Sequence, residues 1–189
     1  MIMDSDIISG GKRVVLDGTK IACHMDRVKD WLAGKRIAPI TIDMALTRAC
    51  NYRCVYCYGT LQENERKNMT KKVLFEFIDD AAEIGVKAIS LVSDGESTCS
   101  PHLYDFVTYA RSKGLDIALG TNGALLKESL LPELLRCLTY LRFNVSAGEA
   151  KRYSEIHGVP EKTFHDFCSI VRKCVEMNDP IGAEPRGIS

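Results

Sequence analysis

The chain has 189 residues, and its 25 basic and 25 acidic side chains leave no formal net charge. A balanced charge gives no general attraction to nucleic acid or to an anionic membrane surface. No apolar run approaches the length of a membrane span, and the N-terminal residues lack the pattern of a secretory signal peptide. We therefore expect a soluble, cytoplasmic protein that binds neither nucleic acid nor membrane.

The composition predicts one domain with short flanking segments. With 46% hydrophobic residues the chain can bury a core, and its length suggests a single domain. Residues 1–37 form a predicted extension, with a strand-like piece around Val14–Leu16 and a helix near Met25–Leu32. Residues 38–178 form the predicted core, and residues 179–189 form an irregular tail rich in Gly and Pro.

Strand patterns alternate with helix patterns from residue 40 onward. Strands are predicted from period-two alternation and apolar runs at 40–46, 87–92, 115–120 and 140–146. Helices are predicted at 71–84, 102–113, 149–156 and 161–177. A further helical stretch contains Pro132, which should split or restart it. This order predicts an α/β fold in which parallel strands are covered by outer helices.

Capping residues mark two of these helices. Thr70 can cap the start of the first, and Gly85 should end it. Ser100 is the expected N-cap of the second, with Pro101 in the first turn and Gly114 just past the end.

A group of three cysteines follows the first strand. Cys50, Cys54 and Cys57 have the spacing Cys-x3-Cys-x2-Cys. Three thiolates this close along a loop can hold three irons of a cubic [4Fe–4S] cluster and leave the fourth iron open to another ligand. A structural zinc site usually needs four ligands in two Cys or His pairs. The other cysteines offer no second pair, and adjacent Cys23 and His24 do not complete one, so a zinc-binding structural module is the weaker alternative.

Polar or glycine-containing segments follow the other three strands. They are Ser93–Glu96, Thr121–Gly123 and the pair Asn144 and Ser146. Ligands of parallel sheets and barrels bind at the carboxyl ends of the strands. We therefore expect these segments and the cysteine loop to converge on one face.

Apolar and polar side chains alternate along the fourth strand, with Leu141, Phe143 and Val145 against Arg142, Asn144 and Ser146. Period-two geometry places the two sets on opposite faces. The apolar set should meet the helices, and the polar set should line a ligand cavity. Asp43 of the first strand either reaches the same cavity or pairs with Arg142.

The cysteine loop resembles that of the radical S-adenosylmethionine (radical SAM) superfamily, with Tyr56 at the aromatic position before the last cysteine. The segment Ser93-Asp94-Gly95-Glu96 resembles the Gly-Gly-Glu segment that receives the methionine amino group in this family. The placement of Thr121-Asn122-Gly123 and of Asn144-Val-Ser146 after later strands is also similar. The resemblance covers about residues 40–178 and implies a partial (β/α) barrel.

The resemblance implies an enzyme that cleaves S-adenosylmethionine. Cys50, Cys54 and Cys57 would ligate the cluster, and the open iron would chelate the amino and carboxylate groups of the cofactor. Reductive cleavage would give methionine and a 5′-deoxyadenosyl radical, which abstracts hydrogen from a small-molecule, sugar or peptide substrate. The electron would come from a low-potential donor such as flavodoxin or ferredoxin.

The resemblance also assigns cofactor contacts. Ser93, Asp94, Gly95 and Glu96 would hold the methionine ammonium through a carboxylate and carbonyls, with Gly95 allowing close backbone approach. The remaining contacts would come from Asn122, from Asn144 and Ser146 to the ribose, and from Tyr56 or the Tyr58 backbone to the adenine. Asp94 replaces the usual first glycine and Ser97 a frequent proline, which should alter the fit without abolishing it.

Other cysteines and histidines have less specific predictions. Buried thiols are expected at Cys137, Cys168 and Cys174, whereas Cys99 lies near the predicted site and could face a substrate. Surface or capping roles, and not catalytic ones, are expected for His102, His157 and His165.

Four predicted strands are fewer than the six that this superfamily usually has. The resemblance therefore implies a short or truncated member in which the last strands are lacking. The uncovered edge of the fourth strand could pair with another chain. A non-catalytic protein that binds an iron–sulfur cluster and S-adenosylmethionine is the second alternative.

Overall fold

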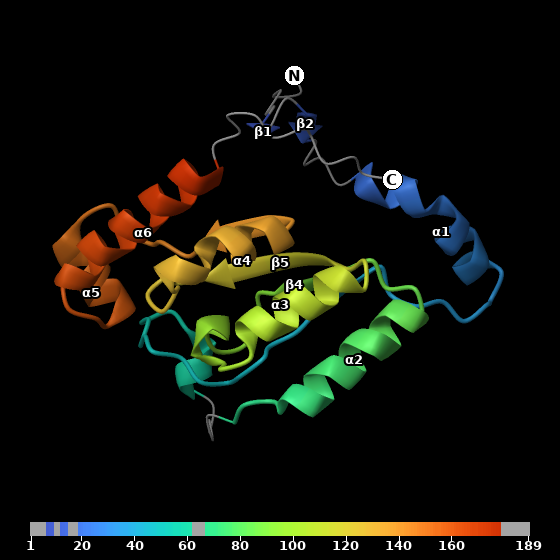
Figure 1. The fold of residues 1–189 in the computed structure, drawn as a ribbon, viewed down its shortest axis with the longest axis horizontal. Coiled ribbons are helices and arrows are strands. Elements are labelled where there is room, and N and C mark those ends of the chain that lie inside the picture. Colours follow the sequence, from blue (N-terminus) through green and yellow to red (C-terminus); the bar gives the residue numbers. More distant parts are fainter. Residues whose placement is uncertain (1–6, 10–11, 15–18, 62–66, 179–189) are drawn as a thin grey trace. The chain divides into compact units, whose positions relative to one another are not determined.

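The computed structural model describes residues 7–9, 12–14, 19–61 and 67–178 (Figure 1). The chain divides into two units, one of residues 1–38 with 179–189 and one of residues 39–178. The predicted tail and part of the predicted strand at Val14–Leu16 lie outside the described residues.

The described residues of the first unit form a small hairpin, a 3-10 helix and one α-helix. Strand β1 (Ile7–Ser9) pairs antiparallel with β2 (Lys12–Val14). A 3-10 helix, η1 (Thr19–His24), leads into α1 (Met25–Leu32), which matches the predicted helix.

The second unit is built on a sheet of four parallel strands in the order β3-β4-β5-β6. The strands are β3 (Thr41–Asp43), β4 (Ala88–Leu91), β5 (Asp116–Thr121) and β6 (Tyr140–Phe143). The predicted α/β fold with parallel strands is confirmed, and the sheet is a partial barrel of the predicted kind. The outer strands are shorter than predicted, because β3 ends at Asp43 and β6 ends at Phe143, where the chain leaves the sheet for the site loops.

Helices cover one face of this sheet. Figure 1 shows α2, α3 and α4 lying along the sheet, and their apolar side chains belong to one core with the strands. The helices are α2 (Lys71–Glu83), α3 (Leu103–Ser112), α4 (Leu131–Cys137), α5 (Ala150–His157) and α6 (Lys162–Asn178). Short 3-10 helices lie between them at η2 (Tyr58–Leu61), η3 (Ser97–Cys99) and η4 (Glu128–Leu130).

The two faces of the sheet differ in burial. Ile89, Leu91, Ile117 and Leu119 are buried against the helices, as expected for every second residue of a covered strand. On the opposite face, Asp43 of β3 is aligned with Ser90 of β4. The exposed side chains of that face include Asp43 and Arg142, together with Tyr140.

The predicted alternation of the fourth strand holds within β6. Leu141 and Phe143 pack against the core, whereas Arg142 and Asn144 are exposed. The prediction for Val145 is wrong, because this residue lies beyond the end of β6 and is 50% exposed.

The predicted N-cap is confirmed at α2. At α3 the predicted N-cap residue, Ser100, is not the residue that precedes the helix. The Thr70 hydroxyl accepts a hydrogen bond from the Val73 N–H at 3.4 Å. Ser100 instead accepts from the N–H of His102 at 3.3 Å, because a turn intervenes and the helix begins one residue later. Pro132 lies in the first turn of α4, where a missing N–H costs little, so the helical stretch restarts there as predicted.

Candidate functional site

The cysteine loop begins on a fixed backbone. Thr47 forms an antiparallel bridge with Asn68, and the Arg48 N–H donates to the carbonyl of Lys67 at 3.1 Å. The Met69 N–H donates to the carbonyl of Leu46 at 3.1 Å on the same pair of segments. The residues just before Cys50 are therefore held by a second segment of chain.

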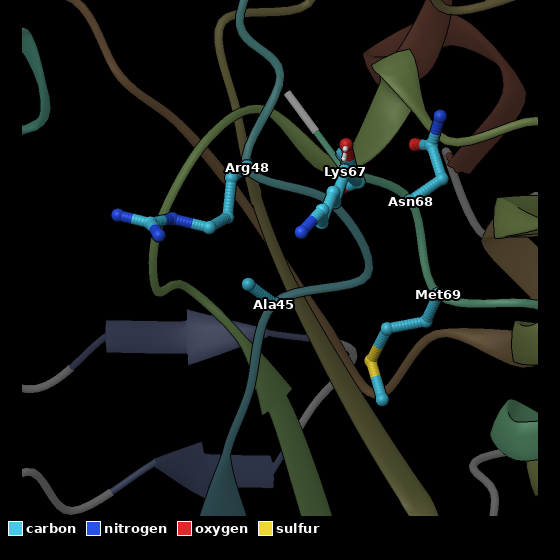
Figure 2. Close-up of a pocket in the computed structure, with 6 residues that line it drawn as sticks. Ala45, Arg48, Lys67, Asn68 and Met69 are labelled. Atoms are coloured by element: carbon cyan, nitrogen blue, oxygen red, sulfur yellow. Dashed lines mark hydrogen bonds between the residues drawn. The ribbon is translucent and has the colours of Figure 1, made fainter. Parts of the chain in front are cut away.

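A hollow of about 250 Å³ lies against these paired segments. Figure 2 shows side chains of its lining residues, which are Ala45, Thr47, Arg48, Lys67, Asn68 and Met69. The hollow adjoins the cysteine loop but contains none of the predicted ligands. We assign no role to it.

The three predicted cluster ligands lie on the loop as free thiols. Cys50 and Cys57 are exposed, and Cys54 is half-buried. The Cys57 N–H donates to the Cys54 carbonyl at 3.0 Å, and the Tyr52 N–H points at the Cys50 sulfur at 3.4 Å. These bonds bend the loop back on itself between successive cysteines.

The thiols are close enough to influence one another. Burial raises the pKa of both Cys50 and Cys54, and the negative charge of Cys57 nearby raises it further. Bound iron would offset this repulsion, since thiolate ligands must be deprotonated to bind metal. The donor set therefore fits an iron–sulfur group.

The described residues contain no set of three or more His, Cys, Asp or Glu side chains around a single metal position. A cubane cluster places each cysteine on a different iron, so its ligands need not converge on one point. The three cysteines of the loop are therefore compatible with the donor set of a cluster.

The turn after β4 packs directly on the cysteine loop. Gly95 has a φ of 69°, and a Cβ placed there would lie 2.4 Å from the carbonyl oxygen of Thr47 and 2.8 Å from that of Ala49. The Glu96 N–H donates to the Ala49 carbonyl at 2.8 Å. Only glycine allows this approach, so the predicted Asp94-Gly95-Glu96 segment and the loop form one unit.

The Glu96 side chain joins the ends of β4 and β5. It is 4% exposed, and its Oε1 accepts from the Thr98 N–H, the Thr98 hydroxyl and the Thr121 hydroxyl, the last at 2.7 Å. Its Oε2 accepts from the Asn122 N–H at 2.7 Å. The carboxylate is therefore a structural tie as well as a predicted cofactor contact.

Other predicted cofactor residues meet in pairs. The Tyr58 hydroxyl donates to Asp94 at 2.5 Å, which raises the pKa of Tyr58. The Ser146 hydroxyl lies 3.0 Å from the Tyr56 hydroxyl. Each pair joins the cysteine loop to the end of a different strand.

The remaining predicted site residues lie at the same edge of the sheet. The Asn122 side chain donates to Asn51 at 2.9 Å, and the Asn144 N–H donates to the Thr121 carbonyl at 2.8 Å. Ser93 is exposed at the start of its turn. Cys99 lies beside the loop, with its sulfur 3.7 Å from the Asn51 side-chain oxygen.

The prediction of a surface or capping role for His157 is wrong. This residue is 1% exposed, and its Nδ1 lies 3.1 Å from the Cys54 sulfur. Its Nε2 lies 3.3 Å from the Ser146 N–H, and burial lowers its pKa. His157 and Tyr153 are four residues apart on one face of α5, which brings their rings together.

The end of α5 is docked on the cysteine loop. The Arg53 N–H donates to the carbonyl of His157 at 3.1 Å, and a Cβ on Gly158 would lie 2.8 Å from the Arg53 carbonyl oxygen. The Tyr52 and Tyr153 hydroxyls lie 3.3 Å apart, in a small core that these side chains share with Phe167. Burial raises the pKa of both tyrosines.

The other cysteine and histidine predictions fare better. Cys174 is buried in the main core, and Cys137 packs against it half-buried. Cys168 packs against the smaller core. His165 is exposed, and His102 is the residue that precedes α3.

Among the described residues we found no helix whose length and apolar character would let it span a membrane. Two relatives that match by sequence are named as synthases. The AdoMet-dependent heme synthase of Methanosarcina barkeri (strain Fusaro / DSM 804) is 33% identical over 126 residues, which are 65% of this chain and 36% of the relative. The Fe-coproporphyrin III synthase of the same organism is 38% identical over 93 residues, or 47% of this chain and 22% of the relative. The chain thus spans well under half the length of these relatives.

Solved structures share the fold. The structure of native anSMEcpe with bound AdoMet has a TM-score of 0.61 and 17% identity, and the match covers 74% of this chain and 41% of that one. Streptococcus suis SuiB bound to the precursor peptide SuiA has a TM-score of 0.60 and 17% identity, covering 85% of this chain and 37% of that one.

The family itself is shown by sequence. Residues 44–181 match the family model that is described as "Radical SAM superfamily". The cofactors of this superfamily are a [4Fe–4S] cluster and S-adenosylmethionine, and solved neighbours contain AdoMet. The chain therefore belongs to the radical SAM superfamily.

Proposed function

We propose that this chain binds a [4Fe–4S] cluster through Cys50, Cys54 and Cys57 and cleaves S-adenosylmethionine beside it. The observation that carries the proposal is the contact between the Gly95 turn and the residues that precede Cys50. This contact holds the segment expected to receive the methionine against the loop expected to hold the cluster.

When bound, the cluster supplies an electron that cleaves S-adenosylmethionine to methionine and a 5′-deoxyadenosyl radical, which abstracts hydrogen from a substrate. The chain's own contribution is to fix three thiolates on a loop that is hydrogen-bonded on both sides. Cys54, half-buried under α5, is the best shielded of the three ligands. Limited access of water to the sulfurs favours a stable cluster.

The turn after β4 offers acceptors for the methionine ammonium. A carboxylate oxygen has two lone pairs, so Glu96 Oε2 can accept a second bond beside the one from Asn122. Backbone carbonyls of Ser93, Asp94 and Gly95 would complete the cradle. Charge-assisted bonds of this kind are about twice as strong as neutral ones.

The nucleoside would lie along the loop and the end of β6. Asn144 and Ser146 would bind ribose hydroxyls, and the exposed Tyr56 ring or the Tyr58 backbone would contact the adenine. The bond between Tyr56 and Ser146 supports this assignment, because it brings an aromatic ring and a ribose-binding hydroxyl together. Asp94 replaces the family's glycine here, and its bond to Tyr58 uses the added carboxylate to anchor that ring.

We propose a small molecule, a sugar or a peptide as the substrate, placed over the exposed polar face of the sheet near Asp43 and Arg142. SuiB, which shares the fold, was solved with a precursor peptide, and this supports a peptide as one candidate. The electron donor would be a low-potential protein such as flavodoxin or ferredoxin. A second chain could pair with the outer edge of β6, which among the described strands is bonded only to β5.

The test is anaerobic reconstitution with iron and sulfide, followed by dithionite and S-adenosylmethionine. We expect about four irons and four sulfides per chain and release of 5′-deoxyadenosine. Cys54→Ala should lose the cluster. Cys137→Ala is the matched control, because Cys137 lies at the end of α4 that leads into β6, away from the carboxyl ends of the strands.

Three outcomes separate the alternatives. Cluster with 5′-deoxyadenosine supports the enzyme, and cluster without cleavage supports a non-catalytic binding protein. Tight zinc with no cluster would contradict the proposal. Equal cluster content in Cys54→Ala and Cys137→Ala would contradict the assigned ligands.

A further inference from the structure

A buried histidine faces one of the proposed cluster ligands. His157 is the last residue of α5, and its Nδ1 lies 3.1 Å from the Cys54 sulfur. The side chain is 1% exposed, so this contact is shielded from water. Hydrogen bonds to cluster sulfurs are among the features that set the reduction potential of an iron–sulfur centre.

The surroundings decide which ring nitrogen carries the hydrogen. The backbone N–H of Ser146 lies 3.3 Å from Nε2 of His157. A backbone N–H can only donate, so Nε2 has to be the acceptor. A neutral imidazole with a bare Nε2 carries its hydrogen on Nδ1, and that nitrogen faces Cys54. The arrangement therefore directs an N–H at the sulfur.

The ring is also held in place. The centroid of the Tyr153 ring lies 4.2 Å from that of His157, and the Tyr52 ring lies 5.8 Å away on the cysteine loop. The His157 carbonyl accepts the N–H of Arg53 at 3.1 Å, so backbone and side chain of the same residue both bind the loop. A donor fixed in this way needs little reorganisation when charge on the sulfur changes.

We propose that His157 is a positioning residue for the cluster, donating an Nδ1–H···S bond to Cys54 that raises the cluster's reduction potential. The inference rests on the proposed function, because it requires Cys54 to be a ligand. A donor stabilises the more negative, reduced cluster more than the oxidised one. Removing it should therefore make reduction harder.

Three substitutions separate the donor from the ring and from the acceptor. His157→Asn places an amide N–H near the position of Nδ1 and gives up the acceptor for Ser146. His157→Gln places an amide oxygen near the position of Nε2 and gives up the donor to Cys54. His157→Phe keeps a ring that can pack on Tyr153 and removes both hydrogen bonds.

The main measurement is a redox titration of the reconstituted protein, followed by electron paramagnetic resonance, with iron and sulfide analysis of each variant. At a fixed solution potential we expect about tenfold less reduced cluster, relative to oxidised, in His157→Gln and His157→Phe, or about 59 mV for a one-electron couple. His157→Asn should stay close to the parent protein. Loss of the cluster from the Gln and Phe variants with retention in Asn would also support the donor role.

Several results would overturn the inference. A full cluster with unchanged potential in His157→Gln and His157→Phe would overturn it and leave the proposed function intact. Loss of the cluster from all three variants would show that the donor is not what matters. If the parent chain takes up no cluster, the proposed function fails, and the tuning role fails with it.

A second measurement does not depend on the cluster. Nitrogen-15 shifts of the His157 ring in the metal-free protein report which nitrogen is protonated. We expect hydrogen on Nδ1 and a bare Nε2. The opposite tautomer would contradict the inference even in a protein that binds a cluster normally.

Discussion

Two residues of the candidate site, Gly95 and Glu96, combine a structural role with a predicted role in cofactor binding. Gly95 makes the turn that should receive the methionine, and it also provides the surface on which Thr47 and Ala49 rest. Glu96 is a predicted cofactor contact, and it also ties the end of β5 through Thr121. Substitutions at these positions should therefore affect folding as well as cofactor binding.

The contact at Gly95 makes a sharp prediction. Gly95→Ala should lower the free energy of unfolding by about 3 kcal/mol, because the new Cβ combines a strained φ with overlap on two carbonyl oxygens. Urea unfolding of the metal-free protein measures this. Gly114→Ala is the matched control, since its φ is 80° but nothing lies within 4 Å of the added Cβ, and it should cost only about 1 kcal/mol. Equal losses in the two variants would contradict the close contact.

Glu96→Gln tests the carboxylate as a structural tie. The new amide would turn an N–H group toward donors that now bind an anion, so we expect a loss of about 1–3 kcal/mol in unfolding free energy. Glu133→Gln on the exposed side of α4 should change stability by less than about 0.5 kcal/mol. An unchanged urea midpoint in Glu96→Gln would contradict a stabilising role for the second carboxylate oxygen and its charge.

At the scale of elements, α5 is the part of the site that the sequence did not reveal. Its residues carry no recognised motif. The helix ends in a histidine, a residue type that is common as an exposed cap at a helix end. The side chain is buried only because the cysteine loop folds over it, with Gly158 allowing the Arg53 backbone to approach. Such a contact depends on tertiary packing, which local patterns do not contain.

The packing of α5 on the loop predicts a response to alkaline pH. Burial raises the pKa of Tyr52 and Tyr153, so the folded protein keeps their protons when the unfolded chain loses them. Their stabilising effect is present below about pH 10 and is lost as the pH rises above that value. In the metal-free protein, Tyr52→Phe should weaken the decline of the urea midpoint between about pH 9 and 11. An equally steep decline in Tyr52→Phe would contradict this coupling.

The strands and helices of the core were predictable because apolar residues recur along each of them with a clear period. The positions of the strand ends were less predictable: β3 and β6 stop at Asp43 and Phe143, although the N–H groups of Met44 and Asn144 still donate to carbonyls of β4 and β5. The convergence of the cysteine loop with the turns followed from parallel topology alone. The bonds that realise it, such as Tyr58 to Asp94, could not be predicted, because they join side chains whose rotamers depend on the packed site.

At the scale of the whole molecule, the four-stranded sheet places the predicted site at the carboxyl ends of its strands and leaves Asp43 and Arg142 exposed on the face opposite the helices. The chain spans 36% of the heme synthase and 22% of the Fe-coproporphyrin III synthase that it matches. Side-chain hydrogen bonds join the cysteine loop to the segments that follow β4, β5 and β6.

The most direct test of this account is the electron paramagnetic resonance spectrum of the reduced, reconstituted protein with and without S-adenosylmethionine. Binding of the cofactor to an open iron should change the g values of the reduced cluster, and this change should be weaker or absent in Glu96→Ala at the same cofactor concentration. A cluster spectrum that is identical with and without S-adenosylmethionine would contradict the claim that one iron is free to bind it.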